Sequence, residues 1–401
     1  MISSNAFGDT MSKKRPIEFY SEIDGIADKE AFIESIQEGF KDIKDPRLED
    51  NQTYRLLDLL IIILIAVLAG ANTIIEIHTY AQVKIGMLKR LLKIETAPSY
   101  NVFWWLLTRL NPRQIESCFV HWIQSLPDED KNKLIAIDGK HIRGAGRNKK
   151  IHLVSAWDSN RSLLLGQVKA NEKSNEITAI PELLDNLDLT GATVTIDAAG
   201  CQIDIVKKIR KERGNYVIAL KGNQKTLQVE AEKFFTQARE TGHKDCQVNF
   251  SCEKGHGRIE EREVIVTNQL DWLTCRSKWK DLTSLIEVTS RRTIKGKTTE
   301  ERRFYISNLV LEAKRSGDIV RSHWSIENRL HWNMDMNFGE DASLAATGNA
   351  AENLAALKRL ASTMIRIDLG GIRGTAHRRR QAAWDDSWTL KLLSRIFDIK
   401  V

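Results

Sequence analysis

Residues 134–140 of the chain run Leu-Ile-Ala-Ile-Asp-Gly-Lys, a short apolar stretch that ends abruptly in a carboxylate, a glycine and a cation. Four apolar residues with polar neighbours predict a buried strand that brings Asp138 to the edge of a sheet. Residues 192–197 (ATVTID) repeat the pattern, because a β-branched, apolar run again ends in an aspartate, Asp197. Aspartate is also common at the start of turns, so each residue alone fits a turn as well as a site. The two aspartates indicate a functional site only if a third acidic residue joins them.

The third candidate acid is Glu327, which lies far along the chain between two histidines. His323, Glu327 and His331 recur every four positions and are therefore expected on one face of a helix. If Glu327 meets Asp138 and Asp197, three oxygen ligands converge, and such a set suits Mg²⁺ or Mn²⁺. Two such ions can clamp a phosphoryl displacement, and they also offset the mutual repulsion of the acids. A buried cluster of ion pairs is the alternative explanation of the same spacing.

The composition is that of an ordinary soluble globular protein, with 42% hydrophobic and 28% charged residues among 401. This length allows two or three domains. The 60 Lys and Arg residues exceed the 53 Asp and Glu residues and give a net charge of +7, which favours an anionic partner such as a nucleic acid. The five cysteines are odd in number and lack paired CxxC spacing, so we expect a reduced, cytoplasmic setting and no cysteine-based zinc site.

Two stretches bear on export or membrane insertion, and neither has the required pattern. Residues 1–20 contain cations but no apolar core, so we expect no secretory signal. Residues 59–71 (LLIIILIAVLAGA) are the most apolar run, but they fall short of the roughly 20 residues that cross a bilayer. We therefore predict a buried helix there and no membrane partner.

Prolines and apolar periodicity divide the chain into four predicted segments. Helices are expected over 29–40, 54–71 and 74–92, from Pro98 onward, and over 112–126, whereas strands begin at residue 134. We predict a leader at 1–45, a small all-helical N-terminal domain at 46–130, an α/β domain at 131–345 and a C-terminal helical segment at 346–401.

The α/β segment is expected to begin with three strands in a meander, followed by alternating helix and strand. This order is that of an RNase H-like mixed sheet with helices on its faces. The predicted strands are 134–138, 152–157, 163–168, 193–196 and 216–220, with a basic loop at 140–150 and helices at 175–187 and 202–212.

A β-rich insertion is predicted inside this segment, at about 222–310, because the alternating rhythm stops there. It begins with a helix at 226–241. The short strands expected after it are 263–267, 284–290 and 303–307, separated by charged turns such as 291–299. A helix over 322–336 is then expected to carry Glu327.

Several motifs in a fixed order resemble one known family. They are AIDGK at 136–140, HLVSA at 152–156, EKSNEITAIPELL at 172–184, KGNQ at 221–224, HGR at 256–258 and HWSIENRLHW at 323–332. From about residue 45 to the C-terminus, the chain resembles the ISAs1 family of bacterial insertion-sequence transposases. That family belongs to the IS4-like DDE group and includes the H-repeat-associated proteins of Rhs elements.

The resemblance implies a DDE transposase that cleaves DNA and transfers strands at the ends of its element. It makes Asp138, Asp197 and Glu327 the catalytic acids and the ligands of two Mg²⁺ or Mn²⁺ ions. It also implies an RNase H-like core with an insertion between the second and third acid. The implied partners are double-stranded DNA, as terminal inverted repeats and as target, and a second copy of the chain that helps to pair the two ends.

The sequence departs from IS4-type relatives around the third acid. Relatives carry a Tyr-Arg-Glu-Lys signature, whereas this chain has Val320, His323, Glu327 and Met334 at the corresponding positions. We expect His323 to replace the arginine as a contact to phosphate. No residue is assigned to the role of the lysine. The basic residues that relatives carry after the Glu-Asp pair are also absent from 343–349.

Polar and basic residues near these motifs are candidates for DNA phosphate contacts, whose strength would depend strongly on salt. Each of them singly fits an ordinary solvated side chain equally well. Trp324 is a candidate for stacking on an unpaired base, with packing against the sheet as the favoured alternative. The phosphate-contact candidates are Lys140, Arg143, Lys221, Asn223, His256, Arg258, Arg321, His323 and Arg329.

The sequence leaves other functions open beside a metal-dependent DNA transposase. A catalytically idle relative would bind DNA through its basic surface without cutting it, and the missing basic residues at 344–347 favour this alternative. A nuclease without strand transfer would use the same three acids.

Overall fold

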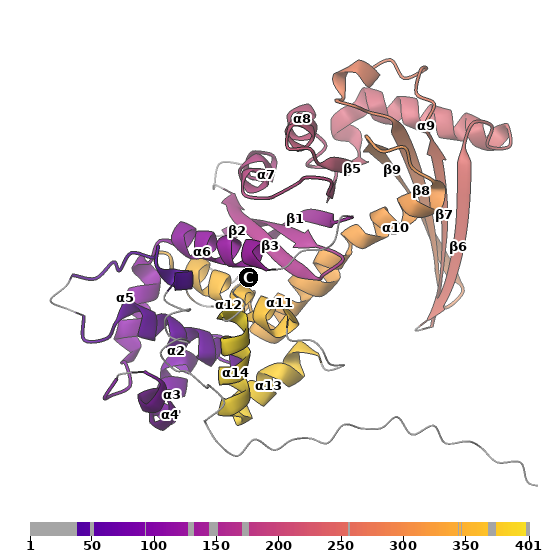
Figure 1. The fold of residues 1–401 in the computed structure, drawn as a ribbon. Helices are drawn as coiled ribbons and strands as arrows, with labels where there is room; N and C mark the ends of the chain where they lie inside the picture. The colour runs from indigo at the N-terminus through magenta and orange to yellow at the C-terminus, as the bar shows by residue number, and fades with distance from the viewer. Residues whose placement is uncertain are drawn as a thin grey trace, which may run out of the picture.

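The computed structural model describes most of the chain after residue 37 (Figure 1). The predicted leader at 1–45 and the helix expected at 29–40 lie largely outside the described residues, and His256 lies outside them as well. The described ranges are 38–48, 52–92, 94–126, 132–143, 151–170, 176–255, 257–343, 345, 347–367 and 374–397.

One mixed β-sheet runs from the centre of the molecule to its upper right edge in Figure 1. In the described residues it has nine strands, in the order β3-β2-β1-β4-β5-β9-β8-β7-β6. The strands are β1 (Leu134–Ile142), β2 (Ile151–Asp158), β3 (Leu163–Ala170), β4 (Thr193–Ile196), β5 (Asn215–Leu220), β6 (Gln247–Gly255), β7 (Arg258–Thr267), β8 (Ser284–Ile294) and β9 (Lys297–Ser307).

Strands β1 to β5 form an RNase H-like core, and this confirms the predicted fold class. β2 pairs antiparallel with β1 and β3, whereas β4 pairs in parallel with β1 and β5. Parallel strands need crossover connections, and helices α7 (Glu176–Asp185) and α8 (Ile203–Lys211) supply them. The first four residues of β1 and all of β4 are buried, which explains why these positions are apolar or β-branched throughout. Of the basic loop expected at 140–150, residues 140–142 belong to β1 instead, and residues 144–150 lie outside the described residues.

The predicted insertion at 222–310 extends the same sheet. β9 pairs antiparallel with β5, then β8, β7 and β6 follow, and helix α9 (Lys225–Glu240) lies across them (Figure 1). The charged turn expected at 291–299 is present but shorter than predicted, because β8 extends to Ile294 and β9 begins at Lys297. The sequence pattern also misses β6, whose nine side chains are all exposed or half-buried. Buried apolar residues mark only one end of β7, β8 and β9, and their outer ends are mainly charged.

Helices from both ends of the chain pack together into one layer, in which α6 and α12 pack on β3 of the sheet. Helix α12 packs on α2, α5, α6 and β3, so the indigo and yellow ribbons lie side by side in Figure 1. The helix expected over 74–92 is broken at Lys84 into α3 and α4. The segment boundaries at 45, 130 and 345 stay predictions. The helices of this layer are α2 (Leu56–Leu68), α3 (Ile74–Val83), α4 (Ile85–Leu91), α5 (Tyr100–Arg109), α6 (Pro112–Ser125), α12 (Ala350–Ile367), α13 (Thr375–Trp384) and α14 (Asp386–Phe397).

Helix α2, which contains most of the apolar run at 59–71, is a buried helix, as expected. From Leu59 to Leu68 each side chain is at most 2% exposed. Arg379 of α13 closes the end of this helix, because its guanidinium donates to the carbonyls of Val67 (2.7 Å) and Ala71 (3.2 Å). Within the described part of the chain, none of the helices combines the length and apolar character that crossing a bilayer requires.

The segment that carries the third acid is not one continuous helix. The helix predicted over 322–336 is divided into the end of α10 (Ala313–His323), a π-helical turn (Ile326–His331) and α11 (Trp332–Phe338). A π turn widens the hydrogen-bonding step from i→i+4 to i→i+5, and such turns are frequent at functional sites. Periodicity alone did not predict the division, because a spacing of four residues fits both kinds of turn.

Gly200→Ala is expected to lower the free energy of unfolding by about 1–3 kcal/mol, because it overpacks a buried site. Its added Cβ would lie 2.3 Å from Cγ2 of Ile196, at the end of β4. Urea titration of the full-length protein measures the change. Gly86→Ala is the matched control: no atom lies within 4 Å of its added Cβ, and alanine favours a helix. A Gly200 variant as stable as the wild type would contradict the close packing described here.

Candidate active site

Asp138 and Asp197 lie side by side because β1 and β4 are parallel neighbours. The register pairs Ile137 with Ile196, and each aspartate is the next residue. Neighbouring strands are about 4.8 Å apart, so the two side chains leave adjacent backbones at the same edge of the sheet. Asp197 stands just beyond β4, where its Oδ1 accepts a hydrogen bond from the amide of Ala199 (3.0 Å). The strand pairing thus gathers two acids that lie far apart in the sequence.

Glu327 reaches the same place from the π-helical turn. Asp138, Asp197 and Glu327 all line one cavity of about 650 Å³, together with Lys221 and His323. The structure therefore brings the three predicted acids to one cavity. In the part of the chain that the structure describes, however, no three His, Cys, Asp or Glu side chains stand close enough together to hold one metal ion.

Negative charge accumulates at this cavity. Burial, and then repulsion from Glu176, Asp197 and Glu327, raise the pKa of Asp138 to about 7. Among the described residues, the group within ion-pair distance of Asp138 is the ring of His331, whose Nδ1 lies 3.6 Å from Oδ2. A bound cation would relieve the repulsion, and carboxylate oxygens are the ligands that Mg²⁺ and Mn²⁺ prefer.

The two histidines on either side of Glu327 both reach the sheet. Nδ1 of His323 lies 3.0 Å from Oγ1 of Thr195 in β4, and His331 lies beside Asp138. Four residues of an α-helix turn slightly more than once around the helix axis, whereas four residues of the wider π-helix turn slightly less than once. The two differences partly cancel between His323 and His331, so both side chains point toward the sheet. Burial lowers the pKa of His323 to about 4 and that of His331 to about 3, so both rings are uncharged near pH 7. His323 therefore offers a hydrogen bond but not the charge of an arginine.

Hydrogen bonds fasten the turn before the third acid to the end of β2. Trp157 donates from Nε1 to Ser325 Oγ (3.0 Å), and Ser325 donates to Ser159 Oγ (3.0 Å). Ser159 in turn donates to the carbonyl of Ser322 (3.1 Å). This chain of bonds fixes the backbone from which Glu327 projects.

Several of the predicted DNA contacts bond to other residues of the protein, and Lys140 and Asn223 are two of them. The Lys140 side chain is only 10% exposed, and its ammonium pairs with Asp335 and, at 3.0 Å, with Glu340. Asn223 donates from Nδ2 to the carbonyl of Ala198 (2.8 Å) and so holds the loop after β4. Their contacts with DNA stay predictions, and the structure adds a supporting role for each.

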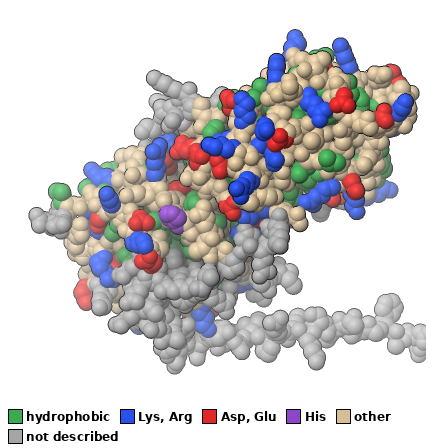
Figure 2. Space-filling model, turned by 45° about the horizontal axis from the view of Figure 1, so that its top comes forward, with side chains coloured by type: hydrophobic (Ala, Val, Ile, Leu, Met, Phe, Trp, Pro, Cys, Tyr) green, Lys and Arg blue, Asp and Glu red, His purple; other side chains and the backbone are tan. Residues whose placement is uncertain are grey.

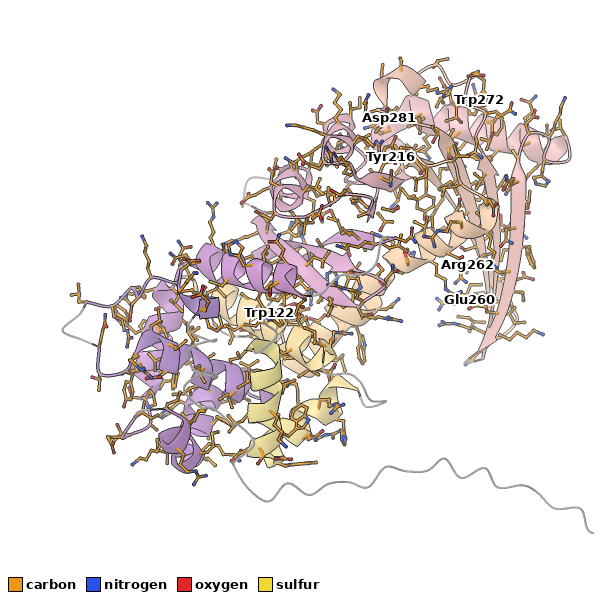
Figure 3. The ribbon with its side chains drawn as sticks, viewed as in Figure 1. Trp122, Tyr216, Glu260, Arg262, Trp272 and Asp281 are labelled. Atoms are coloured by element: carbon orange, nitrogen blue, oxygen red, sulfur yellow. The ribbon has the colours of Figure 1, made fainter. Side chains whose placement is uncertain are left out.

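A second groove, of about 1050 Å³, lies between α10 and strands β7–β9 and shares Arg303 and Trp324 with the acid cavity. Figure 3 labels Arg262 and Glu260 on β7, where both line this groove. Its charges alternate in sign, and on the face drawn in Figure 2 groups of Lys and Arg likewise have Asp and Glu between them. The predicted DNA contacts that line the groove are Arg258, Arg321 and Arg329.

The other predicted contacts lie in different surroundings. Lys221 lines the acid cavity, and the Arg143 side chain is 85% exposed beside Asp341. Trp324 is 39% exposed, and the guanidinium of Arg303 lies 4.7 Å from the centre of its ring. A cation therefore covers one face of this tryptophan.

Sequence analysis missed Glu176, a fourth acid near Asp138. It is the first residue of α7, and its Oε1 accepts a hydrogen bond from Nε2 of His152 (3.0 Å). Both residues belong to motifs that carry the family resemblance, at 152–156 and 172–184. Those motifs are the signal that could have identified the pair, because no spacing rule connects them.

An RNase H-like sheet with three acids around one cavity defines a protein of the DDE class. The chain belongs to the transposase DDE family: the family model "Transposase DDE domain" matches residues 129–364. A second model, "DDE_Tnp_1-associated", matches residues 37–123. The resemblance found in the sequence is thereby confirmed.

Relatives along nearly the whole chain carry transposase names. The chain is 33% identical to the "H repeat-associated putative transposase YhhI" of Escherichia coli (strain K12), over 90% of this chain and 98% of that protein. It is 36% identical to the "Putative transposase YncI" of Escherichia coli O157:H7, over 87% of this chain and 91% of that protein. Among solved structures, it is similar to a cryo-EM structure of the piggyBac transposase synaptic complex with hairpin DNA. That similarity has 13% identity and a TM-score of 0.44, over 90% of this chain and 80% of that chain.

His331→Gln is expected to make the folded protein less sensitive to acid. The pKa of His331 is about 3 in the folded protein against 6.5 for an ordinary histidine, so the unfolded chain takes up the proton first as pH falls. Stability is therefore lost below about pH 6.5. Between pH 7.5 and 5.0 the wild type should lose on the order of 1–2 kcal/mol more than the variant. Urea titrations in EDTA at both pH values measure the difference.

The control is His121→Gln, because His121 is exposed on α6. That variant should follow the wild type at both pH values. If the His331 variant loses as much stability as the wild type, His331 is not held uncharged in the folded protein.

Proposed function

We propose that this chain is the transposase of an insertion sequence, which cuts DNA at the ends of its element and joins the freed 3′-hydroxyl to target DNA. The observation that carries the proposal is the convergence of Asp138, Asp197 and Glu327 on one cavity of an RNase H-like sheet. Membership of the transposase DDE family and the names of the relatives support the same reaction class.

We assign Asp138, Asp197 and Glu327 as the catalytic acids and as ligands of two Mg²⁺ or Mn²⁺ ions. Their chemistry fits, because all three are carboxylates, and burial together with repulsion from nearby acids raises the pKa of Asp138, which a bound cation would lower again. In the described residues no three ligands surround one point, so binding requires the side chains to draw together. When bound, such ions activate the attacking oxygen and stabilise the leaving oxygen of a phosphodiester.

Other residues of the cavity and the groove are proposed to position the DNA. His323, as an uncharged donor, and Lys221, as a cation, line the acid cavity and are assigned to the phosphate under attack. Residues of the adjoining groove are assigned to the backbone farther from the cut. The groove residues are Arg258, Arg321 and Arg329, and the remaining proposed contacts are Lys140, Arg143, Asn223 and His256.

The DNA partners are proposed to be the terminal inverted repeats of the element and its target. Two copies of the chain are proposed to act together, because transposition must hold both ends of the element at once. We also propose a cytoplasmic location, on the ground that five scattered cysteines without paired spacing suit a reducing compartment.

A catalytically idle relative that binds DNA without cutting it is the second candidate. Two observations favour it: the described residues contain no ready three-ligand metal group, and no basic residues occur at 343–349. This candidate would bind DNA in a salt-sensitive way and leave every strand intact in any divalent metal. A nicked product formed by pure protein would exclude it.

Asp138→Asn and Glu327→Gln are each expected to abolish Mg²⁺-dependent cleavage of DNA that contains an element end. Each change removes one charged oxygen ligand and preserves the size of the side chain, so DNA binding should persist. Cleavage on a denaturing gel and binding by fluorescence anisotropy measure the two properties. We expect at least a roughly hundred-fold loss of cleavage rate, since removal of one group that stabilises the transition state commonly costs that much.

The control for this experiment is Asp204→Asn on α8, whose carboxylate is 94% exposed. This variant should cleave at the wild-type rate. Unchanged cleavage by either Asp138→Asn or Glu327→Gln would remove that residue from the catalytic set.

Arg329→Ala is expected to weaken binding to all DNA sequences about equally and to reduce the slope of log affinity against log salt by about one. Its guanidinium lines the groove beside α10 and donates to Ser162 Oγ (2.6 Å), so it is held in place. Anisotropy titrations across a range of KCl concentrations measure the slope. Lys207→Ala is the control, because Lys207 is on α8 across the sheet from α10 (Figure 1). Equal slopes for Arg329→Ala and the wild type would show that Arg329 does not contact the DNA backbone.

A further inference from the structure

Glu176 is an acid beside the proposed metal site to which no role has yet been given. It is the first residue of α7, which follows β3, so it comes from the chain between the first and the second acid. Its side chain is 21% exposed, close to the 27% of Asp138. Both carboxylates therefore stand where buried structure meets solvent.

Gly139 makes room for Glu176 directly beside Asp138. A Cβ at position 139 would lie 2.1 Å from Oε1 and 2.6 Å from Cδ of Glu176, far inside van der Waals contact. The carboxylate of Glu176 thus lies against the backbone of the residue that follows Asp138. Any side chain at position 139 would displace it, so glycine there has a reason beyond backbone freedom.

His152 fixes the direction of this carboxylate. Its Nε2 donates to Oε1 of Glu176 (3.0 Å), and its ring is stacked on that of His141, with 4.0 Å between centroids. Burial lowers the pKa of His152, which favours the uncharged ring. An uncharged donor orients a carboxylate without neutralising it, so the negative charge of Glu176 stays available to a cation.

Geometry connects Glu176 with both aspartates. Its carboxylate lies against Gly139, the residue after Asp138, and the register of β1 with β4 places Asp197 beside Asp138. In the described part of the chain, the group within ion-pair distance of Glu176 is the ring of His152 and not a lysine or an arginine. The fold thus brings a fourth acid to the first two without a lysine or an arginine paired to it.

On the basis of the proposed function, we propose that Glu176 is a fourth carboxylate of the metal centre, on the β2 side of Asp138, and that His152 and Gly139 hold it there. The oxygen donors then come from four elements: β1, α7, the end of β4 and the π-helical turn. The alternative is a structural acid at a helix N-terminus, where a carboxylate stabilises the helix dipole. That alternative affects stability but not metal affinity.

Glu176→Gln separates these roles, because glutamine still accepts the hydrogen bond from His152 but has no charge. The measurement is isothermal titration of Mn²⁺ into the full-length protein without DNA, with a thermal melt in EDTA as a check on folding. We expect Mn²⁺ affinity to fall roughly ten-fold or more, as when a residue that supports a metal site is removed. Glu182→Gln is the matched control, because Glu182 is an exposed residue of the same helix, and it should bind Mn²⁺ like the wild type.

Asp138→Asn in the same titration separates this inference from the proposed function. If Asp138→Asn weakens Mn²⁺ binding and Glu176→Gln does not, the fourth carboxylate is overturned and the three-acid site stands. If neither weakens binding, the metal site itself fails and this inference fails with it. Should Glu176→Gln fail to fold, Gly139→Ala gives the same test, because its Cβ displaces the Glu176 carboxylate and preserves every charge. Wild-type Mn²⁺ affinity in Gly139→Ala would equally overturn the inference.

Discussion

The parallel pairing of β1 with β4 is the constraint on which the site depends. Residues 134–137 and 193–196 are buried, and this burial holds two strands in register although they lie far apart in the sequence. Because of this register, Asp138 and Asp197 leave the sheet side by side. Like charges would separate if they were free to do so, and here the packed strands prevent it. The hydrophobic core thus maintains the electrostatic repulsion that a bound cation would relieve.

The half of the site that carries Glu327 depends on polar contacts as well as on the burial of Ile326 and Leu330. A buried network joins β1 to α12: Lys140 pairs with Glu340 at 3.0 Å, and Glu340 pairs with Arg359 at 2.8 Å. Glu340 and Arg359 are each about 1% exposed, so loss of one partner would leave the other charge buried and uncompensated. Such a network specifies one arrangement of α11 and α12 against the core strands, and the π-helical turn lies within that arrangement.

The sequence predicted those parts of the structure whose apolar pattern is unambiguous. The strand predicted at 193–196 has the same bounds in the structure, because its four side chains are all β-branched or apolar and all buried. The sequence analysis missed the outer ends of β8 and β9, because their charged and threonine side chains pair across the strands, as in Arg291–Glu300, and give no apolar period. It also missed β6, although Val248, Phe250 and Cys252 alternate there with polar residues. Glu176 and the partners of Lys140 escaped prediction because they meet only in the folded chain. The three acids were predictable from their strand ends and their spacing, supported by the family resemblance.

The central claim is that acids from β1, β4 and the π-helical turn close on divalent ions at one point. A crystal structure of the protein soaked in Mn²⁺, with anomalous difference maps to locate manganese, tests it most directly. The account predicts manganese peaks within bonding distance of carboxylate oxygens of Asp138, Asp197 and Glu327. Manganese absent from this cavity, or bound with Glu327 turned away from both aspartates, would contradict it.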